Sequence, residues 1–479
     1  YDILRGLSPD EFASARDSDG HGSHTASTAA GNAGVEASVF GVGYGPISGV
    51  APRAHVIMYR TAAGPTGSSF YSDLAAAIEQ ATLDGVDALN YSIGGGTNPY
   101  GELPSLAFLA AYANGVFVAC SAGNSGPGPD TVGHREPWTT TVAASTQARS
   151  YAGYLHLEAG GDSLDLTGVS ITSDFAGDVV IGADYGDALC GSVDGVNPFP
   201  LGTFTPNQIV VCQRGATARV EKSFNVWEAG GGGVVLYNPS LNSVNTDNHF
   251  VPTVHLDHGA GQEVLDFMAA HTGVTGAIDG GNVTPAQGDV MAAFSSRGGP
   301  DQRLGISKPD VTAPGEQILA AHSPLVAWIH SGPDGQYFWS IAGTSMSAPH
   351  IAGAGALLKD LHPDWTPGQI KSALMMSALR EGVVKEDGST PADPFDDGSG
   401  RVDLTQAGSV ELTISATAQD YVDHQHDLWN ANYPSLYVPV MPGQITVERT
   451  VRNETGLPRN WKLTPAAPAD VTVIVPGHV

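Results

Sequence analysis

In the first 150 residues, segments patterned as buried strands alternate with segments patterned as helices. The predicted strands cover residues 55–59, 87–93 and 116–120, and the predicted helices cover residues 71–82 and 106–114. This order is typical of an α/β fold, in which helices pack on the faces of a parallel sheet. In such sheets, functional groups gather beyond the carboxyl ends of the strands. Glycine-rich polar segments follow two of the predicted strands, so we expect a site at that edge.

The overall charge excludes two classes of partner. The chain has 21 Lys and Arg residues against 49 Asp and Glu residues, a formal net charge of −28. Nucleic-acid binding requires a basic surface that replaces the counterions of phosphate, and anionic lipid also attracts basic segments. We therefore expect no nucleic-acid partner and no membrane partner. No run of about 18 apolar residues, the length that spans a bilayer, occurs in the sequence.

The pattern changes three times along the chain, which predicts four segments. Residues 166–286 contain short strand-like runs and one helical run, which indicates a small inserted α/β unit. The helix-rich pattern returns over residues 287–410, and residues 411–479 carry only strand-like runs. The first part of the main domain then covers residues 1–165. The expected strands of the tail, residues 411–416, 445–451 and 471–475, are too few for a complete β-sandwich of roughly seven strands.

Three cysteines are too few for a disulfide scaffold. Cys190 and Cys212 lie in the same segment, and the sequence leaves open whether they form a disulfide or remain free thiols. Cys120 lies in an apolar run and is expected to be a small buried side chain. No Cys or His cluster has the spacing of a zinc site.

Three short segments carry residues suited to catalysis. His21 lies between two glycines, Asn124 follows a predicted buried strand, and Ser345 begins a helix rich in alanine and glycine. Each has an ordinary structural explanation: a turn or core histidine, a turn asparagine and a helix N-cap serine. Together they supply the general base, the oxyanion donor and the nucleophile that serine chemistry requires. Backbone N–H groups at the start of the helix also favour an oxyanion beside Ser345.

These three segments, in the order His, Asn, Ser, resemble the motifs of the subtilisin-like serine proteases (subtilases, peptidase family S8). Residues 90–95 resemble the segment that lines the substrate cleft of that family, and residues 293–299 and 308–315 resemble further family segments. Residues 209–215 resemble the protease-associated (PA) domain, and residues 432–436 resemble the start of a fibronectin-III-like domain. The resemblance implies a parallel-sheet catalytic domain with an inserted PA domain and an incomplete fibronectin-III-like β domain, as in the cucumisin-like branch.

The resemblance also implies roles for individual residues. His21 would deprotonate Ser345, and the Asn124 side chain with the Ser345 backbone N–H would bind the oxyanion. A peptide substrate would add as a strand along two segments, Ser92, Ile93, Gly94 and Ser121, Ala122, Gly123. No cofactor is expected to be required, and structural calcium, common in relatives, is not demanded by any Asp-rich loop. The implied partners are polypeptide substrates, the protein's own propeptide and a second copy through the PA domain, and the implied location is extracellular.

The triad aspartate of the family is the one serious departure. The family carries it in an Asp-Thr-Gly-type segment upstream of the histidine, and no such segment precedes His21. Asp17 and Asp19 are the nearest acids, but they match the polar lead-in to the histidine motif. We expect the missing acid upstream of Tyr1, which makes the sequence an internal fragment. The alternative is a pseudoprotease that binds peptides without cleaving them.

Overall fold

The computed structural model describes residues 16–61 and 69–479. Its main sheet has four parallel strands in the order β13-β5-β4-β3. Their bounds are Ala88–Tyr91 (β3), Phe117–Ser121 (β4), Thr140–Ser145 (β5) and Val311–Pro314 (β13). The long helix α7 (Thr344–Leu361) contacts all four strands, and α2 (His21–Ala30) packs against α7. This arrangement confirms the predicted parallel α/β fold.

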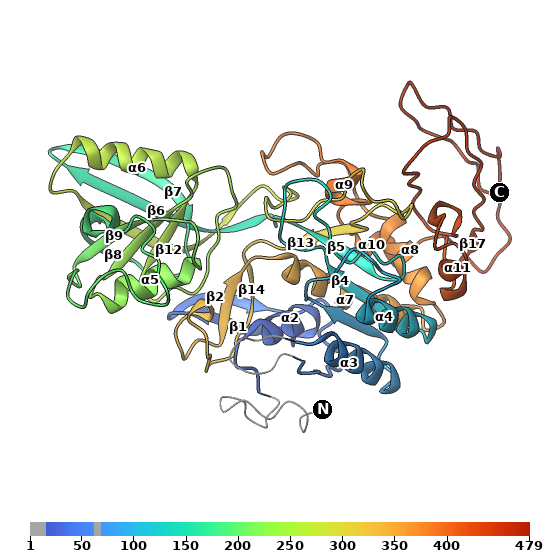
Figure 1. The fold of residues 1–479 in the computed structure, drawn as a ribbon, viewed down its shortest axis with the longest axis horizontal. Coiled ribbons are helices and arrows are strands. Elements are labelled where there is room, and N and C mark those ends of the chain that lie inside the picture. Colours follow the sequence, from blue (N-terminus) through green and yellow to red (C-terminus); the bar gives the residue numbers. More distant parts are fainter. Residues whose placement is uncertain (1–15, 62–68) are drawn as a thin grey trace.

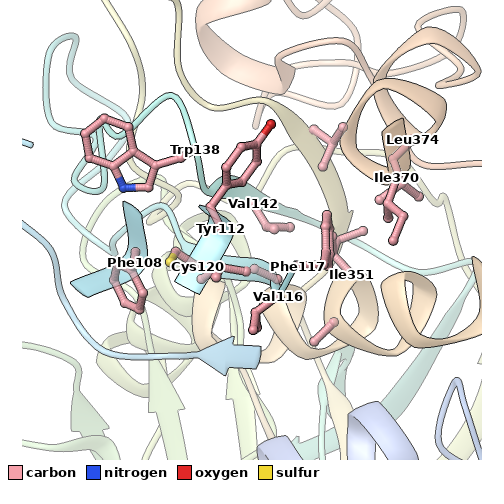
Figure 2. Close-up of a cluster of buried hydrophobic side chains, with 14 of the residues drawn as sticks. Phe108, Tyr112, Val116, Phe117, Cys120, Trp138, Val142, Ile351, Ile370 and Leu374 are labelled. Atoms are coloured by element: carbon pink, nitrogen blue, oxygen red, sulfur yellow. The ribbon is translucent and has the colours of Figure 1, made fainter. Parts of the chain in front are cut away.

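A single apolar core joins this sheet to its helices. Helices α3 (Tyr71–Leu83) and α4 (Leu103–Ala113) confirm two predicted helices, and α8 (Pro367–Met376) follows α7. Figure 2 shows Phe108 and Phe117 in the same cluster as Ile351 and Leu374, so strands and helices distant in sequence share one core. Trp138 is also in this cluster and donates its indole N–H to the Ser105 carbonyl at 2.9 Å.

The predicted strand over residues 55–59 is wrong. These residues are extended but unpaired, and Val56, Ile57 and Met58 are 51, 52 and 57% exposed. A strand forms only beside a partner that bonds its N–H and C=O groups. Within the described residues, β3 ends the sheet and no strand lies next to residues 55–59.

The inserted unit is a closed barrel of seven strands in the order β10-β11-β7-β6-β12-β8-β9. We call residues 149–285 the barrel domain; Figure 1 shows it to one side of the main sheet. Its helices are α5 (Arg219–Glu228) and α6 (His258–Ala270). The strand bounds are Arg149–Ala159 (β6), Asp162–Val169 (β7), Phe175–Ile181 (β8), Gln208–Gln213 (β9), Gly233–Tyr237 (β10), Thr253–Leu256 (β11) and Thr275–Pro285 (β12).

The predicted start of this unit at residue 166 is wrong, because that boundary divides β7. Strand β6 pairs with β7 on one side and along β12 on the other, so the barrel closes only when residues from Arg149 onward are included. Cys190 and Cys212 form a disulfide, which decides between the two alternatives that the sequence left open. Cys120 is free and buried, as expected.

The expected domain boundary at residue 411 is also wrong. Tyr421, Leu428 and Tyr433 are buried in the core of the main domain. The strands of this region are β16 (Leu412–Thr413) and β17 (Arg452–Asn453), which pair with each other, and an isolated bridge joins Lys462 to His478; residues 445–451 and 471–475 form no strand. A lone two-stranded pair is marginal without a further sheet to cover it, and the described residues contain no second sheet here.

The remaining elements are short. They are β1 (Val35–Val39), β2 (Val42–Ile47), η1 (Gly182–Tyr185), β14 (Ile318–Ala321), η2 (Ile329–Ser331), β15 (Phe338–Ile341), α9 (Pro394–Asp397), α10 (Leu404–Ala407), α11 (Ala418–Asp423) and η3 (Leu428–Asn430). Among the helices of the described chain, none combines the length and apolar character that crossing a membrane requires.

Candidate active site

Ser345 is the second residue of α7, and strand β15 leads into it. Its hydroxyl donates to the Ser92 carbonyl at 3.2 Å, and the Ser92 hydroxyl donates back to the Ser345 carbonyl at 2.8 Å. Ser92 directly follows β3, so this reciprocal pair joins the start of α7 to the carboxyl end of the sheet. The prediction that Ser345 begins a helix is confirmed.

Asn124 lies beyond the carboxyl end of β4, and its amide orientation is set by Thr344. The Asn124 Oδ1 atom accepts from both the backbone N–H and the hydroxyl of Thr344, each at 2.9 Å. Because Oδ1 takes both donors, the Nδ2 group faces away from them. A Cβ atom built on Gly343 would lie 3.7 Å from Asn124 Nδ2 and 3.7 Å from Ser345 N. The Asn124 amide and the Ser345 backbone N–H therefore lie close to each other beside the nucleophile, and donors placed in this way can stabilise an oxyanion.

His21 is the first residue of α2, and glycine is required before it. Gly20 has φ +99°, and a Cβ atom there would lie 2.2 Å from the buried ring of His322. Burial lowers the pKa of His21, although Asp19 and Asp17 act in the opposite direction. A neutral imidazole is the form that can accept a proton from serine. In the described part of the chain, no hydrogen bond joins the His21 ring to Ser345, but the helices that carry them are packed together.

The two acids before His21 are committed to other partners. The Asp17 carboxylate accepts from the N–H groups of Gly20 and Ser23, both at 2.8 Å. Burial acts to raise the pKa of Asp17, but these hydrogen bonds outweigh it, so the pKa lies below the ordinary value. Asp19 accepts from the His21 backbone N–H at 3.0 Å and lies 3.1 Å from His330 Nε2. Neither carboxylate bonds the His21 ring, in keeping with the reading of both as lead-in residues.

A wide slot of about 1840 Å³ lies beside His21. Residues 54–60, β3 and Ser92, Ile93 and Gly94 line it together with the start of α2. Pockets for small ligands have volumes of about 300–1,000 Å³, so this slot has room for a length of polypeptide. Ile93 and Gly94 are exposed along it, where a substrate strand was predicted.

Ser121, Ala122 and Gly123 are placed differently. They do not line the slot, and Ser121 and Ala122 are buried. The Ala122 N–H donates to the Val142 carbonyl at 3.0 Å, and the Gly123 N–H donates to the Thr344 hydroxyl at 3.1 Å. A direct role for this segment in substrate pairing stays a prediction.

Sequence reasoning missed the residues that hold the segment Ser92, Ile93 and Gly94 in place. The Ile93 carbonyl accepts from the Ser121 hydroxyl at 3.2 Å and is 2.9 Å from His134 Nε2. The other ring nitrogen of His134 is 3.3 Å from buried Glu136. A histidine followed two residues later by a glutamate is not a distinctive pattern, so only the tertiary structure identifies it. Within the residues described, no group of three His, Cys, Asp or Glu side chains could hold a metal ion.

Comparisons with known proteins agree with this arrangement. Residues 6–408 match the model of the subtilase family. The chain is 35% identical to the Arabidopsis thaliana subtilisin-like protease SBT5.4 over 97% of this chain and 65% of that protein. It is 38% identical to the subtilisin-like protease SBT1.7 of the same plant, over 86% of this chain and 56% of that protein. The chain thus spans between about half and two thirds of the length of these relatives. It belongs to the subtilase family and is similar to subtilases of the plant type.

Proposed function

We propose that the protein is a serine endopeptidase in which Ser345 is the nucleophile, His21 the general base and Asn124 an oxyanion donor. The observation that carries the proposal is that Asn124 Nδ2 and Ser345 N lie near each other, both beside Gly343 and the Ser345 nucleophile. An oxyanion formed there accepts two hydrogen bonds that are already oriented, because Thr344 holds the Asn124 amide from its other side.

The reaction follows from these positions. His21 removes the hydroxyl proton of Ser345 as the oxygen attacks the scissile carbonyl, and the carbonyl oxygen becomes the oxyanion. His21 then gives the proton to the leaving amine, and an acyl-enzyme remains on Ser345. Water, activated by the same histidine, hydrolyses the ester and restores the serine. The substrate lies along Ser92, Ile93 and Gly94, and Ser121 and His134 support this segment from behind through the Ile93 carbonyl.

The slot beside His21 supports a further part of the proposal. A strand in the part of the slot lined by β3 and residues 54–60 would meet the edge of β3 that pairs with no other strand in the described residues, and the exposed side chains of Val56, Ile57 and Met58. Such a strand would carry the carboxylate that orients His21, while the substrate occupies the part of the slot at Ile93 and Gly94. Asp17 and Asp19 are unsuited to this role because backbone N–H groups and His330 occupy their carboxylates.

The barrel domain is proposed to be a PA domain, and the tail beyond its packed part to belong to a fibronectin-III-like domain. An extracellular location is supported by the Cys190–Cys212 disulfide, since disulfides persist mainly in oxidising compartments. Binding of the propeptide in the substrate cleft and pairing of two copies through the barrel domain belong to the same proposal. No step of the proposed reaction requires a metal.

The deciding experiment is casein clearance by the complete protein and by its Ser345→Ala variant. The parent should clear casein, and the variant should not, although it folds with the same circular dichroism spectrum. Ser347→Ala is the matched control, because Ser347 lies in the same helix turn but is fully buried. Clearance that survives Ser345→Ala would refute the assignment, and a complete protein that binds casein without clearing it would favour a pseudoprotease.

A further inference from the structure

A second, smaller pocket lies where the barrel domain meets β15, the strand that leads into the helix of Ser345. It has a volume of about 220 Å³ and is lined by Ala218, Arg219, Val220, Asp247, His330, Trp339, Ile341 and Ala342. The first three residues and Asp247 come from the barrel domain, and the others come from the main domain. Ile341 is the last residue of β15 and Ala342 follows it, four and three residues before Ser345. The pocket is thus built by two domains and lies next to the catalytic helix.

The two walls are joined by direct hydrogen bonds. The Thr246 hydroxyl of the barrel domain lies 2.6 Å from the Ser340 hydroxyl of β15. The Asn248 amide donates to the Phe338 carbonyl of the same strand at 3.0 Å. Helix α5 also contacts η2, which carries His330. These contacts fix the barrel side of the pocket relative to Ser345.

Arg219 carries the charged group of the pocket that is accessible to a ligand. Its Nε and Nη2 atoms bond the Asp247 carboxylate at 2.5 and 2.9 Å. The Asp247 side chain is 8% exposed, whereas that of Arg219 is 24% exposed, so the open side of the pair is the guanidinium. A guanidinium has five N–H donors. In the described structure, Nη1 of Arg219 has no hydrogen-bond acceptor, and it is therefore free for a ligand.

The surroundings add to this positive character. Arg219 is the first residue of α5, whose N-cap residue makes no side-chain bond, and the start of a helix carries partial positive charge; the acid of this first turn, Glu221, accepts from the Ser192 N–H at 2.9 Å. The carboxylate of the pocket lining, Asp247, is held in the ion pair with Arg219: burial acts to raise the pKa of Asp247, but Arg219 outweighs it and holds this pKa at about 2. The other wall is apolar, formed by Trp339, Ile341 and Ala342. A carboxylate on a short side chain suits such a site, in contrast to the net charge of −28 of the whole chain.

The position of the pocket relative to Ser345 indicates which part of a substrate would enter the pocket. The Ser345 hydroxyl bonds the Ser92 carbonyl, so the predicted substrate strand at residues 92–94 approaches from one side. Ile341 and Ala342 lead into Ser345 through Gly343; they line this pocket and not the slot, whereas residues 92–94 line the slot and not this pocket. We infer that the pocket is a subsite for an acidic side chain of the substrate on the leaving-group side of the scissile bond, with Arg219 as the residue that selects it. This inference rests on the proposed function.

The test measures binding and uses the complete protein with Ser345→Ala, so that no peptide is cleaved. Fluorescent peptides carry a single Asp at one of four successive positions after a fixed apolar residue, and each is paired with the same peptide carrying Asn. We expect one position at which Asp binds about tenfold more tightly than Asn, which corresponds to ~1.4 kcal/mol. A photoreactive group next to that Asp should label residues 218–220.

The selecting residue is tested by the double substitution Arg219→Gln with Asp247→Asn, which removes both charges and leaves no unpaired buried ion. The preference for Asp should fall below about twofold, while the Asn peptides bind as before. Arg149→Gln, an exposed arginine of the same domain, is the control and should keep the preference. The inference is overturned if no position prefers Asp, if the preference survives the double substitution, or if none of the peptides binds. Casein clearance by the parent reports separately on the proposed catalysis.

Discussion

Replacing Tyr433 by phenylalanine should weaken the attachment of the C-terminal segment to the main domain. The Tyr433 hydroxyl donates to Asp310 Oδ1, at the centre of a fully buried cluster. The same carboxylate accepts from Lys308 Nζ at 2.6 Å, from the Thr141 N–H at 2.7 Å and from Lys371 Nζ at 3.0 Å. Phenylalanine keeps the ring, over which Lys371 Nζ lies 4.5 Å from the centroid, and loses only the hydroxyl.

The magnitude follows from this single loss. A hydrogen bond to a charged group contributes about 1.5–3 kcal/mol, and Asp310 keeps its three N–H donors. We therefore expect the free energy of local unfolding to fall by ~2 kcal/mol. Where exchange follows local opening, this corresponds to amide hydrogen exchange about 30-fold faster in that segment.

Hydrogen exchange with mass spectrometry on the peptide of residues 428–437 measures this directly, and it avoids a two-state assumption for a multidomain chain. Tyr437→Phe is the matched control, because its hydroxyl donates only to the Pro300 carbonyl at 3.2 Å nearer the surface. Its effect should remain within about 0.5 kcal/mol. Equal exchange rates in Tyr433→Phe and the parent would refute the view that this buried cluster holds the segment in place.

Three further predictions follow from the site and its supports. Asn124→Ala should lower kcat of the complete protein by about 10²–10³-fold with little change in KM, the size found when one oxyanion donor is removed; steady-state kinetics with equal kcat would contradict the role. Glu316→Gln should remove part of the pH dependence of stability. Burial raises the pKa of Glu316 from 4.5 to about 7 in the fold, so its contribution is complete below about pH 4.5 and is lost as pH rises toward 7. Melting temperatures measured from pH 4.5 to 8 should therefore fall more steeply with pH for the parent than for the variant, and parallel curves would count against the prediction. Gly20→Ala should cost about 1–3 kcal/mol, because φ is +99° and the new Cβ meets His322; thermal unfolding at the parent's temperature would show the backbone argument to be wrong.

Much of the main domain was predictable because its elements follow local periodicity. The apolar spacing of residues 71–82 and 106–114 corresponds to α3 and α4, and the short apolar run that follows each of them corresponds to β3 and β4. The failures occurred where a neighbour decides the outcome. Residues 55–59 have a strand's composition but no described partner, and β6 and β7 join the barrel only because β12 returns beside β6.

The sequence by itself determined the residue types and the helix start at Ser345, since glycine before an alanine-rich segment and a serine at its first turn are local features. Tertiary structure alone decided how these residues act together. The Asn124 amide is oriented as a donor by the two hydrogen bonds that its oxygen accepts from Thr344. The Cys190–Cys212 disulfide likewise depends on the folded barrel domain, which brings the two cysteines together. Arg219 and Ala342 lie far apart in the chain, yet they line one pocket because the barrel domain bonds to β15. The physical reason is that periodicity records which face of an element is buried, whereas a site depends on contacts between elements that no local pattern encodes.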